Sequence, residues 1–242
     1  MALHANPRCA RGLRRLGLAL REGATLADRE EPSSLALVML HVLKHPLGSH
    51  VITHLRDQTT KPALFRTLAY QISLLLALEA TRDLPLRLTS IQTPLESMES
   101  PILAQPMVVI PILRAGLGMV QPFTDLFPDV SVGYIGIERD HDTAAPRSYY
   151  CKLPQLAGRR LLVVDPMLAS GGSAVQAVSA IKERGGTDLR LVCIVSAPEG
   201  VAAFEAVHPE VPIFTGALDR QLNARKYIVP GLGDFGDRLY GT

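Results

Sequence analysis

One stretch decides the fold of this 242-residue chain: Leu161-Leu162-Val163-Val164-Asp165-Pro166-Met167-Leu168-Ala169-Ser170-Gly171-Gly172-Ser173. Its first four residues are apolar and two of them are β-branched, a pattern typical of a fully buried parallel strand. A glycine-rich loop follows, and the small and apolar residues at 174–183 predict a helix. The stretch therefore predicts a strand, a loop and a helix, the repeating unit of a parallel α/β sheet.

The loop in this stretch has the features of a phosphate site. Gly171 and Gly172 let the backbone approach an anion closely, and the free N–H groups of the following helix point at the ligand. Ser170 or Ser173 is expected to cap that helix. Asp165 repels a phosphate, so we expect it to accept hydrogen bonds from sugar hydroxyls. The stretch therefore predicts a phosphosugar site, although a strand–turn–helix unit without a ligand has a similar pattern.

The rest of the chain alternates in the same way after a helical N-terminal part. A helix is predicted to begin near Pro62, to carry an apolar stripe and to end before Pro85. Strands are predicted at 107–113, 132–137, 161–164, 189–195 and 211–215, with helices near 117–126, 173–184 and 200–207. Ligands of such sheets bind beyond the carboxyl ends of the strands, where Arg114, Asp165 and Glu199 fall.

Four separated segments resemble motifs of the uracil phosphoribosyltransferases, a branch of the type I phosphoribosyltransferases. Residues 165–173 are similar to their motif for phosphoribosyl pyrophosphate (PRPP), and residues 111–118 to their pyrophosphate-side loop. Residues 197–200 resemble a turn after a later strand, and residues 227–242 resemble the uracil-binding C-terminus. The resemblance implies a type I phosphoribosyltransferase-like parallel sheet flanked by helices, with a flexible hood hairpin and a C-terminal base-binding loop.

The same resemblance implies an enzyme of pyrimidine salvage that converts uracil and PRPP to uridine monophosphate (UMP) and diphosphate. Displacement of diphosphate builds negative charge on the leaving group, so the enzyme needs cations there. The resemblance assigns catalytic roles to Asp234, Arg114 and Arg139. PRPP would contact these three residues and Asp165, Pro166, Met167, Leu168, Ala169, Ser170, Gly171, Gly172 and Ser173. Uracil would contact Ile228, Gly233, Asp234 and Phe235.

Mg²⁺ is the expected cofactor, carried by PRPP rather than held in a protein cage, with Asp234 as its one candidate contact. Asp234 is also a candidate to assist the loss of the uracil N1 proton, and the choice between these roles stays open. The resemblance implies a homodimer or a higher homo-oligomer. Whether GTP activates this chain, as it activates some relatives, is left open by the sequence.

Residues 138–154 are polar and interrupt the alternation of strands and helices, as lids often do. The resemblance implies that they form a hood over the sugar phosphate, to which Arg139 contributes, and a solvated hairpin is the alternative. Four positions depart from the family pattern: Ser170 replaces a threonine, Phe235 stands where alanine is common, and Arg225-Lys226 replaces a His-Gly pair. The last change puts the shape of that loop in doubt.

Composition indicates partners that are small molecules. A net charge of +2 at pH 7 favours neither bulk nucleic-acid binding nor a membrane surface. No segment is expected to span a membrane, because Gln71 and Glu79 bound the apolar run at 72–78. Cys9, Cys151 and Cys193 have no C-x-x-C spacing, which predicts reduced thiols and a cytoplasmic location, with Cys193 in the core.

The first 34 residues differ from the rest and lie outside the resemblance. Five arginines precede the first acidic residue, Glu22. Such a start can be an organelle transit peptide, but serine is not enriched, so we expect a poorly structured extension at 1–34 and a phosphoribosyltransferase domain at 35–242.

Two other functions and one other site remain open at this stage. A regulatory RNA-binding protein on the same scaffold would need a basic face, of which residues 8–21 are the only sign. A phosphoribosyltransferase for another base is disfavoured by the uracil-type C-terminus. His45, His50 and His54 could share a helix face, but no carboxylate stands among them at metal-site spacing.

Overall fold

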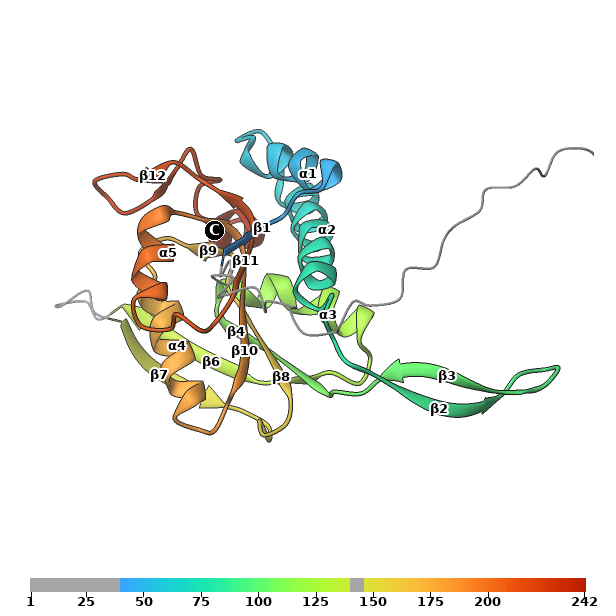
Figure 1. Ribbon diagram of the computed structural model, residues 1–242. Coiled ribbons are helices and arrows are strands. Elements are labelled where there is room, and N and C mark those ends of the chain that lie inside the picture. Colours follow the sequence, from blue (N-terminus) through green and yellow to red (C-terminus); the bar gives the residue numbers. More distant parts are fainter. Residues whose placement is uncertain (1–39, 140–145) are drawn as a thin grey trace, which may run out of the picture. The chain divides into compact units, whose positions relative to one another are not determined.

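The computed structural model describes residues 40–139 and 146–242, so the extension expected at 1–34, with Cys9, lies outside the described residues. Its central sheet has the strand order β1-β11-β10-β8-β4-β6-β7 (Figure 1). These strands are β1 (Leu40–Val42), β11 (Ile213–Leu218), β10 (Asp188–Ser196), β8 (Arg160–Val164), β4 (Met107–Leu113), β6 (Tyr134–Arg139) and β7 (Pro146–Lys152). Neighbours are parallel from β1 to β6, and β7 runs antiparallel to β6. The predicted parallel α/β sheet is therefore confirmed.

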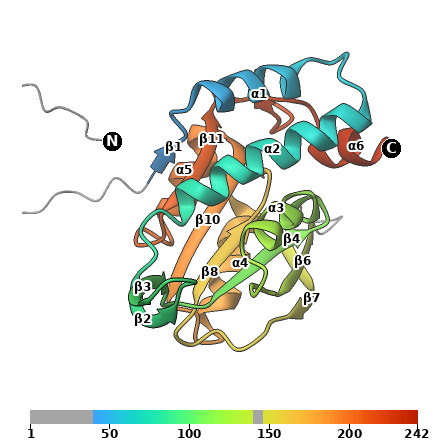
Figure 2. The same cartoon turned by 90° about the vertical axis from the view of Figure 1, so that its right-hand side faces the viewer.

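Helices cover both faces of this sheet. One face carries α1 (Pro46–Arg56), α2 (Pro62–Ala80), α3 (Val120–Leu126) and α6 (Phe235–Tyr240), and the other carries α4 (Gly172–Lys182) and α5 (Pro198–Glu205) (Figure 2). Successive residues of a strand point to opposite faces. Val109 and Leu162 accordingly pack in the core under α2, whereas Val108 and Leu161 pack in the core under α4. Buried on both sides, β4 is apolar throughout, and β8 is apolar after Arg160.

Helix α2 is the longest apolar element of the described residues. Pro62 occupies its first turn, where the missing N–H costs nothing, and Phe65, Ile72 and Leu76 lie on its buried side. By length and composition alone this helix could cross a membrane, so the expectation that no segment is long enough is wrong for α2. Its apolar stripe packs into the core with the sheet, which accounts for that composition.

The strands and helices of the α/β core lie close to their predicted residues. Strand β4 has the predicted bounds, β8 begins one residue earlier than predicted, and β10 is one residue longer at each end. The segment predicted as one strand at 132–137 is divided at Gly133 into β5 (Ser131–Val132) and β6. The helix predicted at 117–126 begins as a 3₁₀ turn, η1 (Ala115–Met119), before α3. Buried Cys193 lies in β10, as predicted.

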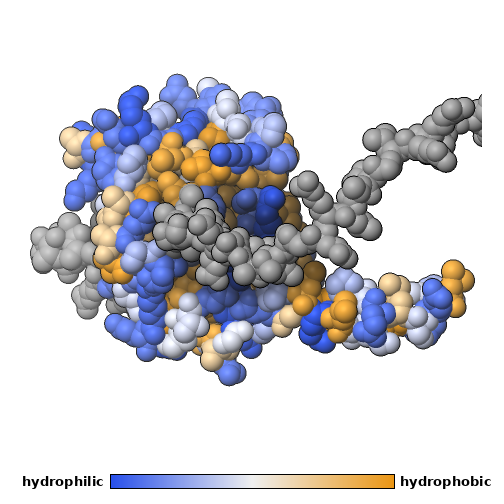
Figure 3. Space-filling model, in the orientation of Figure 1, coloured by the Kyte–Doolittle hydropathy of each residue, from blue (hydrophilic) through white to orange (hydrophobic). Residues whose placement is uncertain are grey.

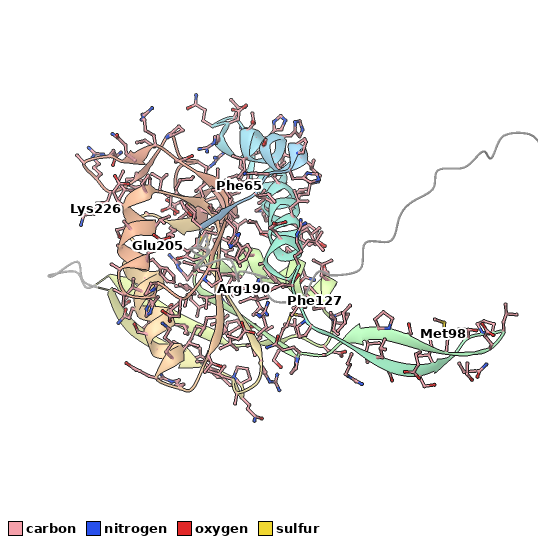
Figure 4. All side chains as sticks on the ribbon, viewed as in Figure 1. Phe65, Met98, Phe127, Arg190, Glu205 and Lys226 are labelled. Carbon is pink, nitrogen blue, oxygen red and sulfur yellow. The ribbon has the colours of Figure 1, made fainter. Side chains whose placement is uncertain are left out.

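A two-stranded hairpin that the sequence pattern did not predict precedes β4. Its strands, β2 (Leu86–Gln92) and β3 (Ser97–Leu103), pair antiparallel and extend away from the sheet (Figure 1). Both faces of this hairpin are exposed, so it lacks the alternation that marks a strand on a core. Apolar groups are spread along its surface (Figure 3), and Met98 projects from it (Figure 4). The edge strand β1 and the short strands β9 (Met167–Leu168), β12 (Gln221–Leu222) and β13 (Ile228–Val229) were not predicted either.

Candidate functional site

The largest hollow near the predicted site residues lies at the carboxyl edge of the sheet. Its volume is about 480 Å³, within the range of small-molecule sites. Three segments far apart in the sequence meet there: the start of η1, the loop after β8 and the C-terminal loop. Its lining residues are Ala115, Asp165, Met167, Ala169, Ser173, Arg225, Lys226, Tyr227, Ile228, Gly233, Asp234, Phe235 and Gly236. Asp165 and the C-terminal loop therefore lie together at this edge of the sheet.

The loop after β8 forms a second, smaller hollow of about 50 Å³. Helix α4 begins at Gly172, and its N-cap is Gly171, whose φ of 82° lies in the left-handed region that glycine adopts readily. The expectation that Ser170 or Ser173 caps α4 is wrong, because no side chain makes the cap hydrogen bond. The first N–H groups of α4 therefore remain available to an anion. The hollow is lined by Asp165, Met167, Leu168, Ala169, Ser170, Gly171, Gly172, Ser173 and Ala174, whereas the buried Pro166 lines neither hollow.

The first turn of α5, with its N-cap Ala197, supports this loop from behind. A Cβ on Gly200 would lie 2.3 Å from the carbonyl oxygen of Ala169, so glycine is required for the close approach. The Ala197 N–H donates to the Leu168 carbonyl at 2.9 Å. Glu199, in the same turn, accepts from the Leu222 N–H at 2.9 Å and so ties α5 to β12. Glu199 thus has a structural role at the edge where the sequence placed it.

Asp165 lies directly after β8 and lines both hollows. Burial raises the pKa of its carboxyl group from an ordinary 3.8 to about 7, and one hydrogen bond from the Met167 N–H acts in the opposite direction. A carboxyl group with so few donors around it can accept hydrogen bonds from hydroxyl groups of a ligand. This agrees with the predicted role toward sugar hydroxyls.

Arg114 follows β4 and is exposed next to the larger hollow, which its neighbour Ala115 lines. The peptide bond between Leu113 and Arg114 is cis. A Cβ on Gly116 would lie 2.6 Å from the Val164 carbonyl oxygen, so this loop crosses directly over the end of β8. The crossing brings the Arg114 loop to the same edge as Asp165, although the guanidinium group itself does not line the hollow.

The C-terminal loop supplies the other wall. Ile228 is buried in β13, and Gly233 and Asp234 are exposed. Asp234 is the N-cap of α6 and accepts from the Asp237 N–H at 3.0 Å. The Phe235 side chain is 1% exposed and packs edge-on against Phe65 at 5.3 Å between ring centroids. Phe235 therefore presents mainly main chain to the hollow, which explains how the alanine-to-phenylalanine departure fits.

The Arg225-Lys226 departure keeps the turn that a His-Gly pair would make. Lys226 adopts φ of 63°, the left-handed conformation that glycine favours. The Asn223 side chain accepts from the N–H groups of Arg225 and Tyr227, which holds the turn between β12 and β13. Lys226 lies on the outer side of this turn (Figure 4). The doubt about the loop shape is thereby resolved in favour of a retained turn.

Ala115, Arg225, Lys226, Tyr227 and Gly236 line the hollow without having been predicted as site residues. Four of them stand inside or next to the recognised C-terminal motif, and Ala115 stands in the motif at 111–118. The motifs therefore contained the signal, but nothing in the residue types distinguished lining residues from their neighbours.

Two further predicted features have a clear position. Arg139 ends β6 and pairs with Pro146 of β7, so residues 138–154 include an antiparallel hairpin; the Arg139 side chain lies outside the described residues.

His50 and His54 stack edge to face at 4.6 Å, whereas His45 caps α1 by accepting from the Leu47 N–H. In the described part of the chain, no three His, Cys, Asp or Glu side chains are arranged to hold a metal ion.

Comparison with known proteins is consistent with these motifs. The family model described as uracil phosphoribosyltransferase matches residues 42–242. A uracil phosphoribosyltransferase of Rhizobium leguminosarum bv. trifolii is 49% identical over 203 residues, 83% of this chain and 97% of the relative. One from Rhodospirillum centenum is 50% identical over 206 residues, 84% of this chain and 95% of the relative. The solved structure of AQ2163 protein from Aquifex aeolicus has a TM-score of 0.81 and 36% identity, covering 84% of this chain and 99% of that chain.

Proposed function

Because this chain belongs to the uracil phosphoribosyltransferase family and converts uracil and PRPP to UMP and diphosphate, we propose that its two substrates meet in the hollow at the carboxyl edge. The observation that supports this placement is the convergence of the loop after β8 and the C-terminal loop on one cavity of about 480 Å³. The phosphate cradle and the base-binding segment are thus close enough to hold the two reactants of one transfer.

PRPP takes the side formed by the loop after β8. Its 5′-phosphate binds at the start of α4, where Ser170, Ser173 and the uncapped N–H groups can donate hydrogen bonds. The ribose hydroxyls donate to Asp165, and those donors favour the ionised carboxylate. Pro166 acts by supporting the loop rather than by contact, because it is buried and lines neither hollow.

Uracil takes the side formed by the C-terminal loop. A flat ring with alternating C=O and N–H groups suits main-chain partners at Ile228, Gly233 and Phe235, where the Phe235 side chain is turned into the core. Asp234 lies on the exposed tip between these partners and faces the place where the two substrates join. We assign to it contact with PRPP or its metal, and assistance as uracil loses its N1 proton.

The departing diphosphate needs cations. Arg114 and Arg139 end the parallel strands β4 and β6, which are neighbours in the sheet, so both stand at the edge where this group leaves. Asp165 and Asp234 give the hollow two carboxylates, a donor set that suits Mg²⁺ bound mainly by substrate phosphates. Mg²⁺ would arrive with PRPP, touch Asp234 and neutralise charge on the leaving group.

The direct test is formation of labelled UMP from uracil, PRPP and Mg²⁺. Parallel reactions contain orotate, cytosine or hypoxanthine, or omit PRPP. UMP formed only from uracil and only with PRPP is the expected result. Equal use of another base would contradict the uracil site, and a further pair of reactions with and without GTP measures activation by that nucleotide.

We also propose that the chain forms a homodimer through the β2–β3 hairpin. An isolated two-stranded hairpin is marginal in water, yet Leu86, Leu88 and Leu103 on this one are 62%, 67% and 46% exposed. A second copy would cover these groups. Leu88→Asp should then lower the mass measured by light scattering to that of a monomer, whereas Arg87→Asp, on the opposite face of the same strand, serves as the control. A dimer that survives Leu88→Asp would remove the hairpin from the interface.

The domain boundary and location remain proposals of the same kind. The family match from residue 42 supports a phosphoribosyltransferase domain over 35–242, with 1–34 as an extension. Cys151 and Cys193 are free thiols, which supports a reducing, cytoplasmic location.

A further inference from the structure

The C-terminal loop has a buried root and an exposed tip. Gly231 and Leu232 are buried, whereas Gly233 and Asp234 are exposed at the hollow. The loop contains several glycines and little side-chain bulk, so its own sequence does little to fix its main chain. Its position must come from contacts made by other parts of the chain.

Two side chains grip the peptide groups of Gly231. Asp219, which follows β11 and has a side chain 3% exposed, accepts from the Gly231 N–H at 2.8 Å. Arg56, the last residue of α1, donates from one nitrogen to the Gly231 carbonyl oxygen and to an Asp219 carboxylate oxygen, both at 2.8 Å. Its other terminal nitrogen donates to the second Asp219 oxygen. The three residues thus form a closed ring of hydrogen bonds around the loop root.

A second arginine, Arg238, also forms hydrogen bonds with the root of the loop. Arg238 of α6 donates to the Leu232 carbonyl oxygen at 2.7 Å and to the Asp57 carbonyl oxygen at 2.6 Å. It also donates to the Leu55 carbonyl and lies over the Phe65 ring, 4.5 Å from its centroid. The end of α1 and the root of the loop are therefore joined by the side chains of two arginines.

We propose that Arg56 and Asp219 are positioning residues for uracil, an inference that rests on the proposed placement of the base on this loop. Neither belongs to the residues that line the hollow in the described part of the chain. A base read by main-chain groups is bound well only if those groups stay within a fraction of an ångström of their places. The Arg56–Asp219 pair supplies that constraint by fixing both polar groups of Gly231.

The chain offers a matched ion pair at the opposite edge of the sheet. Arg160 begins β8 and is 7% exposed in its side chain, and it donates to Asp188, the first residue of β10, at 2.7 Å. This pair is far along both strands from the carboxyl ends that carry the site. Its loss should lower stability without moving the C-terminal loop.

The experiment compares Arg56→Lys and Asp219→Asn with Arg160→Lys and Asp188→Asn in the full chain. Lysine keeps the charge of Arg56 but cannot bridge Asp219 and Gly231 with a planar fork. Asparagine keeps the shape of Asp219 but leaves the arginine without its counter-charge. We call the Arg56–Asp219 pair the clamp, and Arg56→Lys and Asp219→Asn the clamp variants. For both clamp variants we expect kcat/KM for uracil, at saturating PRPP, to fall at least about tenfold. We expect kcat/KM for PRPP, at saturating uracil, to change less than about twofold.

The control variants should lose thermal stability but keep the ratio of these two constants. A parallel fall in both constants for the clamp variants would overturn the proposal, and so would a lowered melting temperature with unchanged kinetics. Calorimetric titration with PRPP shows whether a variant still folds its phosphate cradle, and Arg56→Lys is the milder change if Asp219→Asn does not fold. If the unaltered chain makes no UMP, the proposed substrate placement fails; if it does and the clamp variants match it, only the clamp fails.

Discussion

Asp165 stands at the end of a fully buried strand, with the Met167 N–H as the hydrogen-bond donor that acts on its carboxyl group. The surrounding chain therefore disfavours the ionised form until donors arrive from outside. In the proposed placement of PRPP its ribose hydroxyls are such donors, so this position would trade stability of the free protein for binding.

The trade predicts a particular dependence on pH. In the folded chain Asp165 keeps its proton up to about pH 7, whereas the unfolded chain loses it near 3.8. The folded state thus binds more protons between these values, and its stability falls as pH rises through that interval. The Asp165→Asn variant cannot ionise at this position and so should not lose this stability. The difference in melting temperature between the variant and the unaltered protein should therefore grow in favour of the variant from about pH 4 to about pH 7, and stay constant above pH 7. Parallel curves of melting temperature against pH would contradict this assignment.

Asp234 combines a cap with a proposed role toward PRPP, and substitution can separate them. Asp234→Ser keeps an oxygen that can accept from the Asp237 N–H, whereas Asp234→Ala removes the cap at a cost of about 1 kcal/mol. Both variants should lose turnover at least about a hundredfold, because both lack the carboxylate. Chemical denaturation and UMP formation measure the two effects. Turnover retained by the serine variant would leave Asp234 as a cap alone.

Sequence motifs predicted which residues meet at the site better than how each residue is used. Asp165 and Asp234 line the hollow. The N-cap of α4, however, was predicted to be Ser170 or Ser173, whereas the structure has Gly171 at that position and no side-chain cap. The difference is physical: a helix that leaves its N–H groups for a ligand must not satisfy them itself. The Arg56–Asp219 clamp was missed because its partners are 163 residues apart and carry no shared motif.

At the scale of elements, burial decided what could be predicted. Strands β4, β8 and β10 are apolar runs bounded by turn residues, so their bounds were predicted almost to the residue. The β2–β3 hairpin has no buried face, and β1 is only three residues long. Neither could therefore produce a periodic pattern, and β1 is a strand through its pairing with the distant β11.

The turn that carries Gly200 offers a test at this scale. A methyl group there would lie 2.3 Å from the Ala169 carbonyl oxygen and 2.7 Å from the Leu168 carbonyl oxygen, both main-chain atoms of the PRPP loop. Gly200→Ala should therefore displace the loop and raise KM for PRPP at least about tenfold. The control is Ala202→Gly, an exposed change that weakens α5 by about 1 kcal/mol without touching the loop. An equal effect of both variants on KM would show that only helix stability matters.

In the molecule as a whole, the two ends of the sheet carry different groups: ion pairs around Asp83 lie at one end, and the larger hollow lies at the other. At one end Arg160 and Arg190 both pair with Asp83, and Arg160 also pairs with Asp188. Burial acts to raise the pKa of Asp83, but these arginines lower it below 3.8, so their contribution to stability is lost only on strong acidification. At the other end the chain leaves N–H groups and a carboxyl group without such partners. The ion pairs of Arg160 and Arg190 with Asp83 thus lie at the end of the strands away from the hollow.

Removal of residues 1–34 tests whether the remaining 208 residues are sufficient. The family match from residue 42 predicts unchanged kcat/KM for both substrates and an unchanged melting temperature. Light scattering on the same sample records the oligomeric state. A loss of activity on truncation would assign the N-terminal segment to the functional unit.

The inward orientation of Phe235 affects how this protein can change under selection. If uracil is read by peptide groups while the side chain at that position serves the core, a point mutation has no side chain in the base site to exchange. Cells challenged with a toxic 5-halogenated uracil should then escape by alleles that inactivate or unfold the enzyme, and seldom by alleles that discriminate between the analogue and the natural base. On this proposal the base preference depends on the path of the backbone, which a single side-chain substitution changes little.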